Sequence, residues 1–132
     1  MGFFFEFDAV NNVFRACWAG TITDAIFWET YSTAGKLVAS RPPCRGITDM
    51  SGVTKFDVSV EALKRMATMP PVIRPELMHV IIAPKDVLYG LARMFEIRSE
   101  QSRPNLHVVH SMREAEALLG ISEPQFSRID VG

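Results

Sequence analysis

Residues 78–83 read Met-His-Val-Ile-Ile-Ala, and this stretch does most to decide the fold class of the chain. It is nearly all apolar, is β-branched at its centre and is followed by Pro84. Continuous hydrophobicity of this kind is typical of a central strand that is covered on both faces. We therefore expect a sheet that passes through the middle of the protein, with helices packed against it.

The segments after this strand alternate between helix and strand. Residues 86–101 place Val, Leu, Ala and Phe at helical spacing, which predicts an amphipathic helix. Residues 106–110 predict the last strand. The S-x-x-E capping box that begins at residue 111 opens a short helix, which a glycine ends at residue 120. Residues 122–132 are then expected to form a polar C-terminal tail.

The N-terminal segment predicts an antiparallel hairpin. Residues 3–8 alternate, with three Phe side chains on one face and two carboxylates on the other, and residues 13–18 are again rich in β-forming residues. Asn11 and Asn12 stand between the two runs, and Asn tolerates the positive φ that a tight turn requires. Gly20 is expected to close the second strand.

The middle of the chain predicts two helices and one short strand. Residues 23–39 and 59–68 have helical spacing, and residues 47–53 form a polar strand between them. The whole order is a hairpin followed by α-β-α-β-α-β-α. We expect one domain over residues 1–132, of class α/β (α+β), with a mixed five-stranded sheet and about four helices. The hairpin would leave an uncovered edge, which makes a homodimer possible.

Composition narrows the classes of partner. The chain has 132 residues, of which 48% are hydrophobic, so it can bury an ordinary core. Fourteen Lys and Arg against 15 Asp and Glu leave a net charge of −1, which argues against a nucleic-acid partner. No apolar run is long enough to span a membrane, and the first residues lack the basic region of a signal peptide. We expect a cytoplasmic protein with two reduced cysteines.

Motifs of common enzymes are missing from the sequence. It has no GxGxxG, GxxxxGK[ST], GxSxG or HExxH, so we expect no enzyme activity, no catalytic residues, no cofactor and no metal. The enzyme alternative would bring Asp49, Asp57 and His79 together at the ends of parallel strands. A hydrogen-bonded strand histidine is the simpler interpretation of His79. Cys44, beside a cationic neighbour, is expected to be a surface thiol.

One segment combines a strand end, a polar turn and a helix start. Within residues 48–63, Ser59 stands where its hydroxyl would meet the helix N-terminus, with Asp57 and Ser51 nearby. These three residues form a candidate phospho-acceptor or partner surface, and the alternative is that Ser59 is only an N-cap. The arginines at positions 93, 98 and 103 are expected to lie on a solvated face.

A family resemblance comes from five stretches: Asp49-Met-Ser-Gly-Val53, Phe56-Asp-Val-Ser-Val-Glu-Ala-Leu63, Val80-Ile-Ile-Ala-Pro84, Tyr89-Gly-Leu-Ala-Arg-Met-Phe95 and Arg113-Glu-Ala-Glu-Ala-Leu-Leu-Gly120. With the element order, they resemble the STAS domain of bacterial anti-sigma factor antagonists, and more specifically the SpoIIAA-like group of STAS/SEC14 proteins. The likeness spans residues 3–121. It implies a five-stranded sheet flanked by helices and no enzyme activity.

What the resemblance implies about function takes two forms. The antagonists bind a partner kinase and are phosphorylated in a D-S-S-G motif, where Ser59 matches the acceptor while Val58 and Val60 replace its neighbours. We therefore expect a non-enzymatic regulatory or scaffold domain that binds a protein partner. The SEC14-like likeness implies the alternative, a module for a lipid or other apolar small molecule. Tyr89, Arg93 and Phe95 are the candidate ligand or partner surface.

Overall fold

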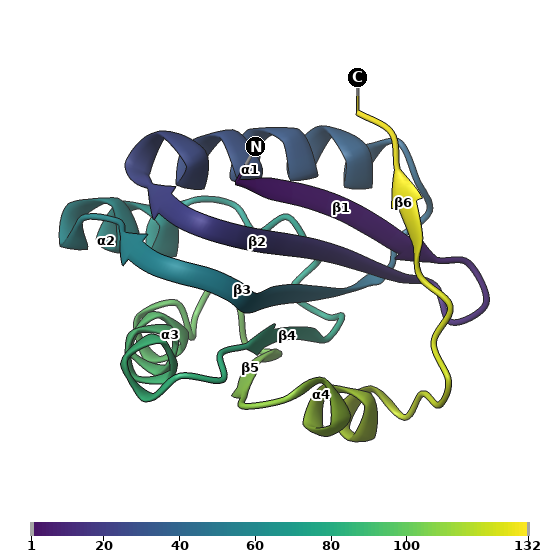
Figure 1. Ribbon diagram of the computed structural model, residues 1–132. Coiled ribbons are helices and arrows are strands. Elements are labelled where there is room, and N and C mark those ends of the chain that lie inside the picture. The colour runs from purple at the N-terminus through teal and green to yellow at the C-terminus, as the bar shows by residue number, and fades with distance from the viewer. Residues whose placement is uncertain (1, 132) are drawn as a thin grey trace.

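The computed structural model describes residues 2–131, so Met1 and Gly132, the two ends of the expected domain, lie outside the described residues. The alternation predicted from the sequence is present (Figure 1). In chain order the elements are β1 (Phe3–Asp8), β2 (Val13–Thr23), α1 (Asp24–Ala39), β3 (Arg45–Asp57), α2 (Val60–Thr68), β4 (His79–Ile82), α3 (Asp86–Arg98), β5 (Leu106–Val109), α4 (Met112–Leu119) and β6 (Ser127–Ile129).

All of these strands join one mixed sheet in the order β5-β4-β3-β2-β1-β6. Strands β2 to β5 are parallel neighbours, whereas β1 pairs antiparallel with β2 and β6 pairs antiparallel with β1. The α/β class and the mixed sheet with an antiparallel edge are therefore confirmed, as are the four helices. Each helix between the parallel strands carries the chain back to the start of the next strand, as parallel pairing requires.

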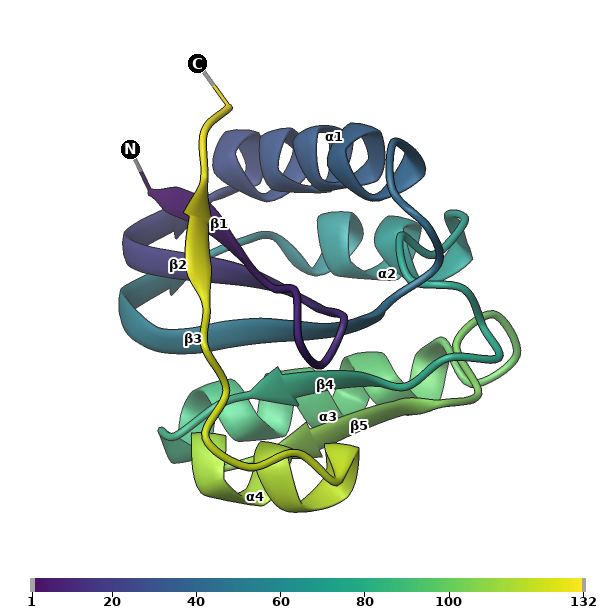
Figure 2. The ribbon, with the colours of Figure 1, turned by 90° about the vertical axis from the view of Figure 1, so that its right-hand side faces the viewer.

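The prediction of five strands was wrong, because the described residues form six. Residues 122–132 were expected to be a polar tail, but Ser127–Ile129 form β6 along β1, with Glu6 opposite Arg128 (Figure 2). This pairing covers Phe5 to Phe7 of the hairpin edge and makes β6 the outer strand of the sheet. The homodimer stays a prediction.

Two strands are longer than predicted. The second extends to Thr23 and the third runs from Arg45 to Asp57, and they pair along most of their length. Gly20 has a positive φ of 77°, and the register shifts beside it, so this glycine marks an irregularity inside β2 rather than its end. The polar residues at both ends of β3 belong to the strand because β2 provides hydrogen-bond partners for their backbone groups.

Local signals at the turns and helix ends are confirmed. Asn12 adopts a φ of 56° in the hairpin turn, and Gly120 ends α4 with a φ of 66°. Ser111 Oγ accepts a hydrogen bond from the Glu114 backbone N–H at 3.2 Å, as the capping box predicts. Helix α3 is shorter than expected and ends at Arg98 instead of residue 101.

The sheet has a buried cluster on each face. Helices α1, α2 and α3 pack on one face, with α1 over the hairpin strands and α3 over β5, and α4 packs on the other face over β4 and β5 (Figures 1 and 2). The first cluster is the larger and contains Phe5, Phe14 and Trp18. No helix in the described part of the chain has the length and apolarity to cross a membrane.

Candidate functional site

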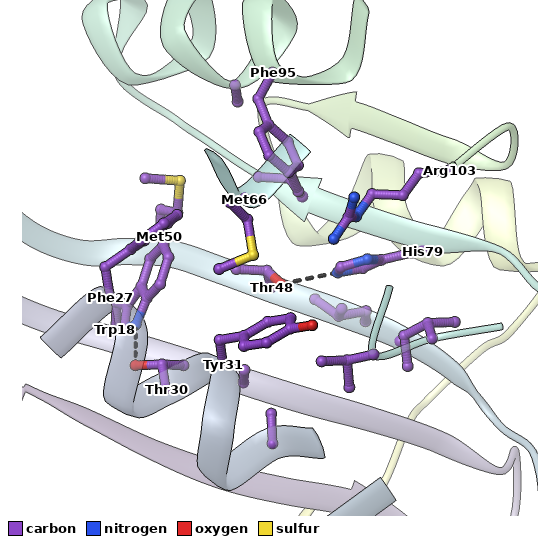
Figure 3. A pocket seen from close by; sticks show the side chains of 18 of the residues that line it. Trp18, Phe27, Thr30, Tyr31, Thr48, Met50, Met66, His79, Phe95 and Arg103 are labelled. Carbon is purple, nitrogen blue, oxygen red and sulfur yellow. Dashed lines mark hydrogen bonds between the residues drawn. The ribbon is translucent and has the colours of Figure 1, made fainter. Parts of the chain in front are cut away.

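The larger core cluster is not completely filled. A cavity of about 140 Å³ lies between the sheet and helices α1, α2 and α3 (Figure 3). Its walls are mostly aromatic and aliphatic. They include Phe14, Ala16, Trp18, Phe27, Tyr31, Met50, Phe56, Leu63, Met66, Ile81, Leu91 and Phe95, together with the polar Thr30, Thr48, His79 and Arg103.

The alternation of the strands sets which side chains reach this cavity. Phe14, Ala16 and Trp18 are every second residue of β2, and so they share the face that α1 to α3 cover. Three of the lining residues are small. Ala16 on the sheet and Ala34 and Ala92 on the helices line the cavity, and all three are buried. Larger aromatic side chains hold the surrounding layers apart.

One end of the cavity is apolar. Trp18, Phe27 and Met50 lie together there (Figure 3). The Trp18 indole N–H donates a hydrogen bond of 2.8 Å to Thr30 Oγ1, and the Thr30 hydroxyl donates to the Ile26 carbonyl at 2.7 Å. Both polar groups are therefore satisfied within the protein, and the Trp18 ring offers an apolar surface.

The other end is polar, and His79 is part of it. His79 Nε2 lies 2.8 Å from Thr48 Oγ1 on the neighbouring strand, so this histidine is hydrogen-bonded as the simpler interpretation predicted. Burial, and then the positive charge of Arg103, lower the pKa of His79 from 6.5 to about 4. The imidazole is therefore neutral at neutral pH.

Arg103 lies beside His79 at this end (Figure 3). Only 8% of the residue is exposed, although the sequence analysis placed it on a solvated face. Its Nη1 donates to Ser102 Oγ at 3.1 Å, and the guanidinium carbon is 5.3 Å from the Phe95 ring centre. Burial lowers the pKa of this guanidinium below its ordinary value, yet arginine stays charged at neutral pH.

The loop between α3 and β5 fixes Arg103 in this position. Its backbone N–H donates to the Ser99 carbonyl at 2.7 Å, and its carbonyl accepts from the Leu106 N–H at 3.2 Å. Ser102 Oγ is 3.2 Å from the carbonyl of Ala67 at the end of α2, which ties the loop to that helix. The side chain of residue 103 is therefore directed inward rather than toward solvent. No sequence pattern marked it, because its burial depends on this loop.

Ser59 lies outside the cavity, at the start of α2. It is the N-cap: its Oγ accepts from the Ala62 N–H at 3.1 Å and donates to Asp24 Oδ2 at 2.8 Å. The Ser59 N–H donates to the other Asp24 oxygen at 2.7 Å. These bonds hold the pKa of the Asp24 carboxyl below its ordinary value. A phosphate on Ser59 would face this carboxylate, and its role as an acceptor stays a prediction.

The remaining candidate residues do not form one surface. Asp57 and Ser51 are exposed on β3, and Tyr89 stacks on His110 with ring centres 3.9 Å apart. Arg93 forms an exposed ion pair with Glu96. Phe95, on the same helix, lines the cavity instead. Of the residues predicted as a ligand or partner surface, only Phe95 therefore belongs to this site.

The enzyme alternative is not supported by the geometry. Asp49 binds Arg15 on the sheet face that α4 packs against, whereas His79 faces the cavity. Asp57 lies at the far end of β3 from the residues that pair with β4. The three residues are therefore not brought together. Cys44 was expected at the surface but is 3% exposed, and burial raises the pKa of its thiol.

A second hollow of about 540 Å³ lies at the surface between the end of α1 and the loop at residues 70–74. Its rim carries Lys36 and Arg74, which are exposed and solvated. Arg74 lies 4.0 Å from Glu76. Tyr31 is the one aromatic residue that lines this hollow among the described residues, so the inner cavity with its several aromatic walls is the better candidate for a small-molecule site.

The comparisons with known proteins do not extend this picture. No family model matches the chain, and no curated protein matches it significantly. Within residues 2–131 no three His, Cys, Asp or Glu side chains are grouped in a way that would hold a metal ion. The chemistry of the site therefore has to be argued from its own residues.

Proposed function

We propose that this protein is a small-molecule-binding module whose site is the cavity between the sheet and helices α1 to α3. The observation that carries the proposal is an unfilled space of about 140 Å³ in the larger of the two core clusters. This space is partly open to solvent while its walls are mostly apolar, so it leaves apolar surface in contact with water. A bound apolar molecule would cover that surface.

The size of the cavity limits the ligand. Apolar cavities of about 150 Å³ bind molecules such as benzene. A complete long acyl chain would need more room, so the ligand proposed here has an apolar body of about six to eight carbon atoms. Of the SEC14-like alternative that the sequence suggested, this size favours the apolar small molecule over a lipid with a long acyl chain. The resemblance to the SpoIIAA-like group and the partner-binding role that it implies remain separate predictions.

Toluene is a suitable neutral probe, and the two indole groups provide the readout. Trp18 lines the cavity, whereas Trp28 lies outside it with Arg65 5.2 Å from its ring centre. In a titration followed by ¹H–¹⁵N spectra, toluene should shift the Trp18 indole signal in a saturable way and shift the Trp28 signal much less. Replacing Ala92, which lines the cavity, by leucine should weaken this binding.

Two results would reject the proposal. One is a Trp18 signal that does not move up to the solubility limit of toluene. The other is a saturable shift that is equal in the Ala92→Leu variant, which would place the bound probe elsewhere.

A further inference from the structure

The buried guanidinium at one end of the cavity has no negative partner within the described part of the chain. The ion pairs of residues 2–131 engage Arg15, Arg74, Arg93 and His110, and Arg103 takes part in none of them. Its side chain donates instead to the neutral hydroxyl of Ser102. Buried charges in proteins are normally paired, because an unpaired one loses its hydration without compensation.

The groups that face Arg103 explain why the protein itself does not supply a counter-charge. His79 is neutral at neutral pH, and Thr48 is occupied with that histidine. The Tyr31 hydroxyl points toward the same end and donates to the Pro70 carbonyl at 2.6 Å (Figure 3). Phe95 offers only the face of its ring. This end of the cavity therefore carries one positive charge that no carboxylate of the described residues pairs with, and its unbonded nitrogens stay accessible next to apolar walls.

We infer that the cavity binds a small monocarboxylate with an apolar body, whose carboxylate pairs with the Arg103 guanidinium while its body lies toward Trp18 and Phe27. The inference rests on the proposed function and adds the chemical class of the ligand. A planar guanidinium matches a carboxylate with two parallel hydrogen bonds, which gives both strength and orientation. The apolar body would then fill the end where the polar groups are already satisfied.

A single charge also favours a carboxylate over a phosphate monoester. Arg103 is the only Arg or Lys that lines the cavity within the described residues. A phosphate monoester carries close to two negative charges at neutral pH, so one of them would remain buried and unpaired. The match of one guanidinium to one carboxylate leaves no net charge in the site.

Benzoate and benzamide test the inference, because they share shape and differ in charge. With the complete chain at neutral pH, benzoate should bind at least about tenfold more tightly than benzamide, the ratio expected when a neutral hydrogen bond is replaced by a charge-assisted one. Benzoate should also shift the Arg103 Nε–H signal. Phenyl phosphate should bind more weakly than benzoate.

Three variants test whether Arg103 causes the preference for benzoate over benzamide. In Arg103→Met the preference for benzoate should disappear while toluene still binds. Arg103→Lys keeps the charge and should retain part of the preference, which provides a second test if the Met variant does not fold. The control Arg113→Met removes an exposed arginine from α4 and should leave the benzoate-to-benzamide ratio unchanged.

The outcomes separate this inference from the proposed function. Binding of toluene and benzamide with no preference for benzoate would overturn the carboxylate assignment and leave the proposed function intact. A stronger response to phenyl phosphate, or a benzoate preference that survives in Arg103→Met, would also overturn it. No binding of any of the probes would reject both.

Discussion

Filling the cavity with the protein's own side chain should stabilise the fold. Ala92 on α3 lines the cavity and is 6% exposed, and leucine is a good helix former. The substitution adds three carbon atoms, which at about 0.8 kcal/mol per buried CH₂ contribute about 2.4 kcal/mol. Ordering the leucine side chain costs about 0.5–1 kcal/mol. The expected gain in the free energy of unfolding is therefore about 1.5 kcal/mol.

The volume of the cavity sets an upper limit on this gain. At about 24 cal/mol per Å³, a fully enclosed void of about 140 Å³ would correspond to about 3 kcal/mol, and this space, which is partly open to solvent, corresponds to less. The expected gain is below this limit, as it should be for a side chain that fills part of the space. For a domain of this size, about 1.5 kcal/mol corresponds to a rise in Tm of about 6 °C.

A matched alanine on the other side of the sheet is the control. Ala115 on α4 is completely buried in the second cluster and does not line the cavity. Ala115→Leu should overpack that cluster and cost about 1–3 kcal/mol. Thermal and denaturant unfolding measure the free energy of unfolding of the two variants, which should rise in Ala92→Leu and fall in Ala115→Leu. If Ala92→Leu destabilises the protein as much as Ala115→Leu does, the space beside Ala92 is already filled and the reasoning is wrong.

Three other contacts lead to further predictions. Because the pKa of His79 falls from its ordinary 6.5 to about 4 on folding, stability should decrease by up to about 3 kcal/mol as the pH is lowered from 6.5 toward 4. His79→Gln should remove this part of the pH dependence in denaturant titrations, and an unchanged profile would contradict it. Ser59→Ala should cost about 1 kcal/mol through the lost cap, measured by urea unfolding, and a loss below about 0.3 kcal/mol would count against the capping role. Burial opposes ionisation of Asp49, but hydrogen bonds from Ser51 and the charge of Arg15 hold its pKa below the ordinary value. Arg15→Met should therefore raise that pKa and cost about 2 kcal/mol, while an unshifted carboxyl signal in an NMR pH titration would refute the pairing.

The local features of the fold could be predicted from the sequence. The alternation of apolar residues in β1, the capping serine before α4 and the turn at Asn12 were each assigned correctly, because such signals depend on a few neighbouring residues. The order of these elements was enough to give the α/β class. A parallel sheet was also predictable, since helices separate the strands.

Pairings between distant segments were harder to predict. Residues 127–129 are a short Ser-Arg-Ile segment without a strand pattern of its own, and they become a strand only because β1 offers an unpaired edge. The full length of β3 likewise depends on β2 as its partner. A polar segment has the same local pattern in a loop and at the edge of a sheet, so only the folded chain distinguishes the two.

The amino-acid sequence alone was enough to predict the four helices and the first five strands, because their apolar periodicity is local. The sequence alone did not predict the cavity. The size of a cavity depends on the volume that several elements enclose and on the volume of the side chains that fill it, and both are set only when the elements pack together. Ala16, Ala34 and Ala92 come from three separate segments, and only their packing together leaves the space. Arg103 is buried for a related reason: the loop after α3 is tied to α2 through Ser102, so its charge faces the core instead of water.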